Sequence, residues 1–179
     1  LTIYSPKKNK FYHIIRNRNQ SHFLLSIYVE YSDKIWLGYD DGLYLLRIND
    51  LEKDDYSFKK VEFLSEEIKR DVRVYAIVPT DTTSLWIGSR AGVTYMNRDD
   101  YSYSFYESNG DPNSPGQGSV KIVYQDLNNN TWIVSSNKGL FRIEQSKIRG
   151  HNFIHYDIKD HNESNSHITC LLQTERGTL

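Results

Sequence analysis

Three short segments centred on tryptophan decide how this chain folds: Ile35-Trp36-Leu37-Gly38, Leu85-Trp86-Ile87-Gly88 and Thr131-Trp132-Ile133-Val134. Six or seven residues after each Trp come a second glycine and an aliphatic residue, in Gly42-Leu43, Gly92-Val93 and Gly139-Leu140. Nine positions before each Trp stands an aliphatic residue, namely Ile27, Ile77 or Val123. The same segment is therefore repeated three times in register.

A fourth copy begins near the C-terminal end. Leu171 takes the aliphatic position, and the sequence stops at Leu179, one residue short of the expected Trp. Measured from Ile27 to Leu171, successive copies are 50, 46 and 48 residues apart. Self-similarity at this period indicates structural repeats that bury their apolar faces against one another.

Within each copy the segments are short and typical of strands. Apolar runs, a glycine turn and an aromatic-rich segment predict four strands per copy, in the second copy Val74–Val78, Leu85–Gly88, Val93–Met96 and Tyr103–Tyr106, and in the third Val120–Tyr124, a Trp132 strand, Leu140–Ile143 and Phe153–Tyr156. Glycine at the turn between strands two and three suits a positive φ, and so does Asn129 between strands one and two. Four strands in about 48 residues make one blade of a β-propeller.

The expected fold is therefore all-β, a partial β-propeller with about three full four-stranded blades and two half blades. The predicted units are roughly 1–20 (partial), 21–65, 70–108, 117–160 and 166–179 (partial). No helix of normal length is expected; a short turn at 64–71 is the one candidate.

Composition agrees with a globular β protein. Of 179 residues, 38% are hydrophobic and 13% aromatic, and aromatic side chains suit pleated, half-buried surfaces. Lys and Arg number 22 against 23 Asp and Glu, which gives no electrostatic case for binding nucleic acid or an anionic membrane. A single cysteine, Cys170, excludes an internal disulfide and paired-cysteine zinc motifs; it is expected to be a small buried hydrophobe.

The repeat resembles the two-component regulator propeller repeat, which fills the periplasmic sensor region of hybrid histidine kinases in gut Bacteroidetes. The best local match runs from Tyr106 to Ile143 and includes Asp111-Pro112-Asn113-Ser114. Copy three departs from the pattern, because Val134 replaces the usual glycine and Thr131 the usual aliphatic residue. We therefore expect the third blade to be the least regular.

The resemblance implies a non-catalytic, ligand-sensing segment in the periplasm, the extracytoplasmic part of an inner-membrane protein. It implies oligosaccharide ligands, transcriptional control of glycan-use genes, a homodimer in the full protein and partners in the rest of the propeller and sensor chain. No cofactor, nucleic acid or membrane contact is expected for this segment. Two alternatives remain: a propeller that serves as a protein-interaction scaffold, and a hydrolase or lyase propeller.

In a propeller, the turns between strands two and three and the loops between blades share one rim. Loops on a rigid scaffold are the usual place for binding, and Arg, Asn and Asp suit hydroxyl-rich or anionic ligands. The candidate ligand-binding residues on this rim are Arg16, Arg18, Tyr39, Asp40, Arg70, Arg90, Asn137 and Lys138. The repeated residues are expected to be structural, with each indole between neighbouring blades: Trp36, Trp86, Trp132, Gly42, Gly92 and Gly139.

No catalytic or metal-binding residue is predicted. His151 and His155 lie on one expected strand, about 13 Å apart at ~3.3 Å per residue, which is too far to share one ion. For the chain ends we expect an open arc, in which the strand predicted at Ile168–Gln173 does not close onto Leu1–Tyr4, because a closing blade would lack its buried Trp.

Overall fold

The computed structural model describes residues 1–16, 22–63, 72–80, 83–106, 115, 118–136, 138–146, 150–156, 168–175 and 177, without the side chains of 145, 146, 150 and 151. The described chain is all-β, as expected, apart from one 3-10 turn, η1 (Leu51–Lys53). None of the described helical structure is long and apolar enough to cross a bilayer. The short turn expected at 64–71 lies outside the described residues.

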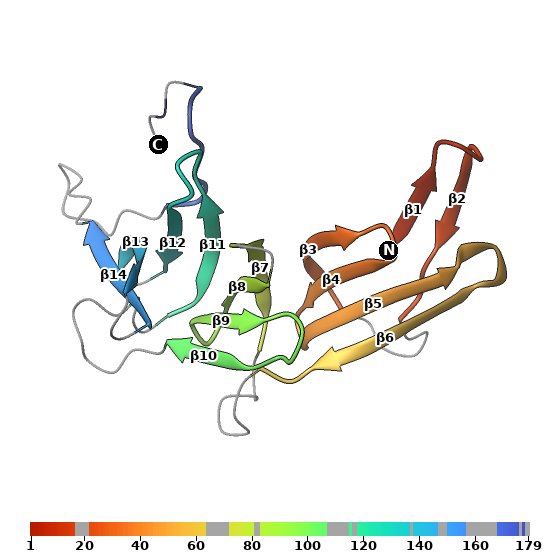
Figure 1. The fold of residues 1–179 in the computed structure, drawn as a ribbon, viewed down its shortest axis with the longest axis horizontal. Helices are drawn as coiled ribbons and strands as arrows, with labels where there is room; N and C mark the ends of the chain where they lie inside the picture. The colour runs from red at the N-terminus through yellow and green to blue at the C-terminus, as the bar shows by residue number, and fades with distance from the viewer. Residues whose placement is uncertain are drawn as a thin grey trace.

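Three antiparallel sheets of four strands follow one another along the chain (Figure 1). The first sheet contains β3 (Leu24–Tyr31), β4 (Lys34–Tyr39), β5 (Gly42–Asp50) and β6 (Asp55–Val61). The second contains β7 (Val74–Pro79), β8 (Ser84–Ser89), β9 (Val93–Asn97) and β10 (Tyr103–Tyr106). The third contains β11 (Val120–Gln125), β12 (Thr131–Ser135), β13 (Gly139–Ser146) and β14 (Gly150–Tyr156). In each sheet the strands pair in chain order, which confirms the strand predictions for the second and third copies.

The N-terminal hairpin, β1 (Thr2–Ser5) and β2 (Lys10–His13), forms a separate two-stranded sheet. It packs on the first sheet at one end of the row of sheets, and residues 168–175 lie at the other end (Figure 1). The strand predicted at Ile168–Gln173 is not formed, and this segment pairs with neither β1 nor β2. A strand needs a hydrogen-bonded neighbour, and none of the described strands pairs with this segment. The predicted unit boundaries fall on residues outside the described ones.

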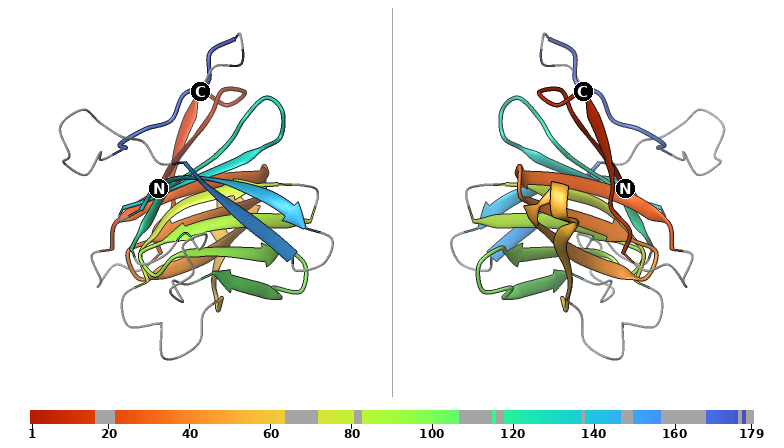
Figure 2. Two further views of the ribbon diagram at one scale, coloured as in Figure 1. Left: turned by 90° about the vertical axis from the view of Figure 1, so that its left-hand side faces the viewer. Right: turned by 90° about the vertical axis from the view of Figure 1, so that its right-hand side faces the viewer.

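The sheets stack face to face, and Figure 2 shows their strands overlapping when the row is viewed from either end. The first strand of each sheet lies close to the first strand of the next, so β3, β7 and β11 are neighbours. Between the first and second sheets Trp36 is fully buried, and between the second and third Trp86 is 2% exposed. The prediction that these indoles fill the space between repeats is therefore confirmed for the first two copies.

Trp132 differs from the other two indoles. It is only half-buried, on the face of the third sheet that points away from the second, where its ring lies 5.2 Å from that of Tyr156. The expectation that copy three is the least regular stays a prediction, since the third sheet has one register shift between its first two strands, as the second sheet has. No four-stranded sheet follows the third one among the described residues, so only one side of this indole is packed.

A second repeated feature, absent from the sequence predictions, is an acidic side chain that accepts a hydrogen bond from the indole N–H. Glu30 Oε2 accepts a hydrogen bond of 2.7 Å from Trp36, and Asp126 Oδ2 accepts one of 2.9 Å from Trp132. Both acids stand six residues before their Trp, at the end of the first strand. Each provides an acceptor for an indole N–H that is partly removed from water.

Glu30 also joins the first two sheets. Its carboxylate lies 2.9 Å from Lys34 Nζ and 3.6 Å from Arg98 Nη1, and all three side chains are nearly buried. Arg98 donates a further hydrogen bond to Tyr28 across the interface. Burial alone would raise the pKa of Glu30, but the hydrogen bonds from Trp36 and Lys34, with the two positive charges, lower that pKa below its ordinary value.

Candidate functional site

The rim expected from the sequence forms at one end of each sheet. The residue after the second strand donates a backbone hydrogen bond to the carbonyl of the residue just before or at the start of the first strand. The three bonds are Asp40 to Phe23 (3.1 Å), Arg90 to Arg73 (2.9 Å) and Ser136 to Ser119 (3.0 Å). The turns between strands two and three and the entries to the sheets therefore lie together.

Glycine at this turn has a conformational reason. Gly42 has φ +137° and Gly92 has φ +147°, values that side-chain-bearing residues rarely adopt. A Cβ at Gly92 would also lie 2.9 Å from the carbonyl oxygen of Tyr106. Gly139 follows the same rule with φ +81°, which confirms the positive φ expected at all three turns.

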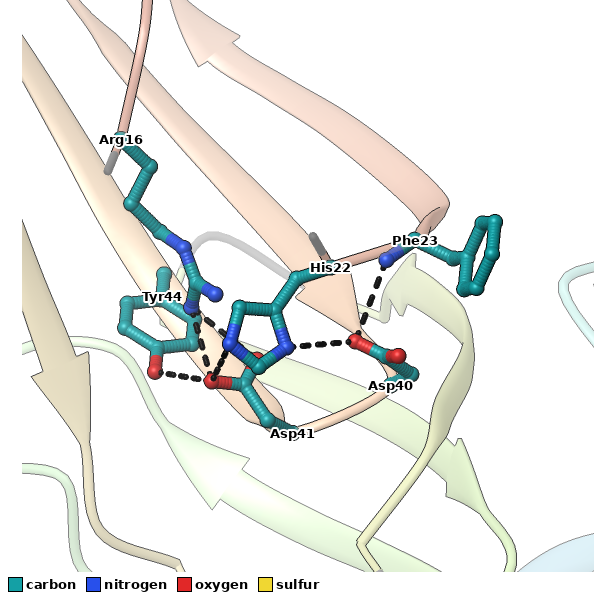
Figure 3. Close-up of polar contacts among 6 residues, drawn as sticks. All are labelled: Arg16, His22, Phe23, Asp40, Asp41 and Tyr44. Carbon is teal, nitrogen blue, oxygen red and sulfur yellow. Dashed lines mark hydrogen bonds and ion pairs between the residues drawn. The ribbon is translucent and has the colours of Figure 1, made fainter. Parts of the chain in front are cut away.

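On the rim of the first sheet, Arg16 and Asp41 form the centre of a polar cluster (Figure 3). Arg16 Nη1 lies 3.0 Å from each carboxylate oxygen of Asp41, and the Tyr44 hydroxyl donates to Oδ2 at 2.9 Å. The guanidinium also stacks between two aromatic rings, 4.4 Å from that of Tyr39 and 4.2 Å from that of Tyr44. Arg16 follows β2, so this contact fastens the N-terminal hairpin to the first sheet.

His22 lies between the two adjacent carboxylates of the turn. Its Nδ1 is 3.1 Å from Asp40 Oδ1 and its Nε2 is 3.6 Å from Asp41 Oδ2. Asp40 Oδ1 also accepts the backbone N–H of Phe23 at 3.2 Å (Figure 3). We name these five side chains the rim cluster: Arg16, His22, Asp40, Asp41 and Tyr44.

The electrostatics of the rim cluster follow from these contacts. Burial alone would raise the pKa of Asp41, but the hydrogen bonds from Tyr44 and Arg16 and the Arg16 charge hold that pKa below its usual value. Burial, together with the bond to Asp41, raises the pKa of Tyr44 to about 12. Asp41 is therefore a carboxylate and Tyr44 a neutral hydroxyl throughout the physiological pH range.

The ligand atoms of His22, Asp40 and Asp41 lie within 4.8 Å of one another, the spacing of a metal site. The contacts of Asp41 argue against a cation there. Both of its oxygens face Arg16, and a metal ion bound to them would lie against the guanidinium charge. The geometry therefore favours an ion-pair network over a metal centre.

The structure brings together three of the predicted rim residues, Arg16, Tyr39 and Asp40. Arg90 is exposed in the corresponding turn of the second sheet, and Lys138 lies in that of the third, where its carbonyl contacts His155 Nε2 at 2.6 Å. Arg18, Arg70 and Asn137 lie outside the described residues. Their proposed role in binding stays a prediction.

Sequence reasoning missed His22, Asp41 and Tyr44. Asp41 is next to Asp40, a predicted rim residue, so the sequence already indicated that Asp41 lies in the same turn. Nothing in the sequence indicated that Arg16, 25 residues away, forms an ion pair with Asp41. One further prediction was wrong: Cys170 is exposed, because the segment expected to bury it does not form a strand.

A second polar cluster lies at the opposite end of the first sheet. Glu52 in η1 accepts from Lys8 at 2.8 Å, from Lys10 at 2.7 Å and from the Tyr12 hydroxyl. The hydrogen bonds from Lys10, Lys8 and Tyr12 lower the pKa of Glu52 to about 2. The N-terminal hairpin is thus fastened to the first sheet at both ends.

The fold is similar to that of three solved structures. No family model matches the chain, and neither does any curated protein. Two solved structures of the extracellular domain of BT4673 from B. thetaiotaomicron, a proposed one component or hybrid two component system, match it with TM-scores of 0.64 and 0.61. They are 15% and 14% identical over 94% of this chain.

The extracellular domain of the proposed hybrid two component system BT3049 from B. thetaiotaomicron matches with a TM-score of 0.53, at 19% identity over 93% of the chain. At these identities the likeness shows a shared fold. The chain spans about a fifth to a quarter of these structures, since it covers 21% of the BT4673 chains and 26% of the BT3049 chain.

Proposed function

We propose that this chain is part of a β-propeller in the extracytoplasmic, ligand-sensing region of a hybrid two-component sensor, and that the segment is not catalytic. The observation that carries the proposal is the row of stacked four-stranded sheets. The same fold occurs in extracellular domains of proteins described as one component or hybrid two component systems. The resemblance of the Trp repeat to two-component regulator propellers supports the same assignment.

The ligand class we propose is an oligosaccharide bound at the rim. The rim of the first sheet presents aromatic, carboxylate and guanidinium groups side by side, and such groups hydrogen-bond and stack on hydroxyl-rich molecules. The contacts of Asp40 with His22 and Phe23 are both made by Oδ1, and we propose its other oxygen, Oδ2, as the acceptor for a ligand hydroxyl. Binding would report to the cell by favouring one of two arrangements of a dimeric sensor.

A non-catalytic scaffold for protein partners is the second candidate, and one observation favours it. Asp41 and Arg16 satisfy each other, and Arg16 is covered by two rings. A rim that is already paired offers fewer groups to a small ligand. A protein partner needs fewer unpaired polar groups on the rim, because a few anchor residues carry most of the binding free energy of a protein interface.

Calorimetric titration of the complete sensor ectodomain with a panel of oligosaccharides tests the proposal. We expect one member to bind, and Asp40→Asn to weaken that binding. Glu52→Gln, at the opposite end of the same sheet, is the matched control and should leave binding unchanged. Heat from none of the oligosaccharides would favour the scaffold, and release of reducing sugar would contradict the non-catalytic assignment.

A further inference from the structure

A row of apolar side chains on β3 has no cover among the described residues. β3 is the first strand of the first sheet, and alternate residues along it point to the same face. Those on the open face, with one residue before the strand, are all large, apolar and exposed: Phe23, Leu25, Ile27, Val29 and Tyr31. We name these five side chains the β3 row. A continuous apolar row of this kind marks an interaction surface.

The interfaces between the first and second sheets and between the second and third sheets show which element covers the equivalent residues. Ile27 corresponds to Ile77 and Val123 in the next two sheets. Ile27 is 47% exposed, whereas Ile77 and Val123 are each 7% exposed. They are covered by the second strand of the preceding sheet, through Trp36 and Trp86.

The glycine two residues after Trp36 and after Trp86 makes this cover possible. A Cβ at Gly38 would lie 2.7 Å from the carbonyl oxygen of Val74, and a Cβ at Gly88 would lie 2.7 Å from that of Val120. The first strand of the following sheet therefore approaches the glycine backbone directly. Trp-x-Gly is the structural element that receives a β3-type strand.

The N-terminal hairpin covers only the outer part of the same face. Ile14 of the hairpin segment is as buried as Phe63, which precedes the second sheet, with each side chain 3% exposed. Ile14 packs on Ile35 and Leu37, just as Phe63 packs on Leu85 and Ile87. The hairpin thus occupies the place of strands three and four of a preceding sheet, and the place of strands one and two remains open.

We propose that the β3 row is the docking surface for an antiparallel strand pair that carries a Trp-x-Gly segment and continues the sheet of β1 and β2. Among the described residues β1 pairs only with β2, so its other edge offers backbone groups to such a pair. The indole would cover Ile27, and the glycine would let β3 approach.

A second copy of this chain does not fit this surface. The opposite end of the row of sheets is the third sheet, where Val134 stands in place of the glycine and pairs with Ile122. In the first two sheets the corresponding pairs are Ser26 with Gly38 and Ala76 with Gly88. Two branched side chains therefore stand where β3 would have to approach, and overpacking of this kind opposes head-to-tail stacking of copies.

The test completes the sheet within the chain itself. A copy of residues 72–92, which contains Trp86 and Gly88, is fused before Leu1, so that its Gly92 precedes Leu1 as Gly42 precedes Leu43. The background carries Ile27→Cys and Cys170→Ser, and the rate of alkylation by iodoacetamide is measured. The matched control fusion has valine at the position of Gly88, as in the third sheet.

We expect the glycine fusion to slow alkylation at position 27 by about tenfold or more relative to the unfused chain, and the valine fusion to leave it close to the unfused rate. Circular dichroism checks that each chain folds, and Val29→Cys replaces Ile27→Cys if the latter does not. Equal protection by both fusions, or by neither, overturns the proposal. So does a concentration-dependent protection of the unfused chain, which would identify a second copy as the occupant.

Discussion

The face of the second sheet that meets the third and the outer face of the third sheet carry the same motif with different outcomes. On the second sheet, Trp86 is buried and Gly88 receives β11 at backbone contact. On the third, Trp132 is half-buried and Val134 stands where the glycine would be. Ile168 corresponds in the repeat to Val74 and Val120, the residues that seat on the glycines.

The difference coincides with one change in the motif, from glycine to Val134. Val134, Ile122 and Ile168 line a cavity of about 280 Å³ instead of a closed interface. The segment from Ile168 onward lies over the third sheet without forming a strand. The segment does not close onto Val134 as Val74 closes onto Gly38, and the indole of Trp132 lacks the cover that buries Trp36 and Trp86.

The largest expected effect is the loss of an indole from a closed interface. Trp86→Ala should destabilise the chain by about 3–5 kcal/mol, since the ring is nearly fully buried between two sheets. Trp132→Ala should cost clearly less, because that ring is packed on one side. Urea unfolding of both variants measures the difference, and equal losses would show that the two faces are equivalent.

The next largest loss of stability is expected from substitution of Gly88. Gly88→Val should cost about 1–3 kcal/mol, because its Cβ would meet the Val120 carbonyl at 2.7 Å and the sheets must separate. Val134→Ala, which shortens the side chain at the matching position of the third sheet, is the control. We expect the introduced valine also to raise the exposure of Trp86, seen as a red shift of its emission. An unchanged stability of Gly88→Val would contradict the close approach.

Substitution of Glu30, which accepts the Trp36 indole N–H, should have an intermediate, pH-dependent effect on the free energy of unfolding. Glu30→Gln should cost about 1–2 kcal/mol at neutral pH, because it removes the charge facing Lys34 and Arg98. The pKa of Glu30 in the folded chain is below the ordinary value of 4.5, so its stabilisation is present above that pH and is lost as the pH falls through the folded value.

Unfolding measured from pH 7 down to pH 3 checks this sign. The gap between the parent chain and Glu30→Gln should be constant above about pH 5 and shrink below 4.5. A gap that widens on acidification would mean that Glu30 is protonated in the folded chain.

The smallest expected effect lies at the rim cluster. Asp41→Asn should cost about 1 kcal/mol, since the Arg16 bond is partly exposed to solvent and the aromatic stacking of Arg16 remains. It should loosen the N-terminal hairpin without affecting the second and third sheets. Hydrogen exchange in β1 and β2 should rise while exchange in β8 stays the same; an equal rise in both would place Asp41 in the global core.

Features that depend on local sequence could be predicted, and side-chain pairs that depend on how the sheets stack could not. The repeat period and the turn glycines predicted the strands, because local chain geometry decides them. The burial of Trp36 and Trp86 followed from their repetition. The Arg16–Asp41 and Glu30–Arg98 pairs could not be predicted, since they join residues that only tertiary stacking brings together. The strand expected at Ile168–Gln173 was wrong, although the departure at Val134 was already visible in the sequence.

Hydrogen exchange of the unmodified chain tests most directly whether the Trp-x-Gly contact makes the interface. The peptides to compare are 74–79, whose Val74 lies against Gly38, and 168–173, whose Ile168 lines the cavity beside Val134. We expect the amides of 74–79 to exchange slowly, at the rate of global unfolding, and those of 168–173 to exchange within seconds like an unpaired segment. Equal protection of the two peptides would contradict the claim.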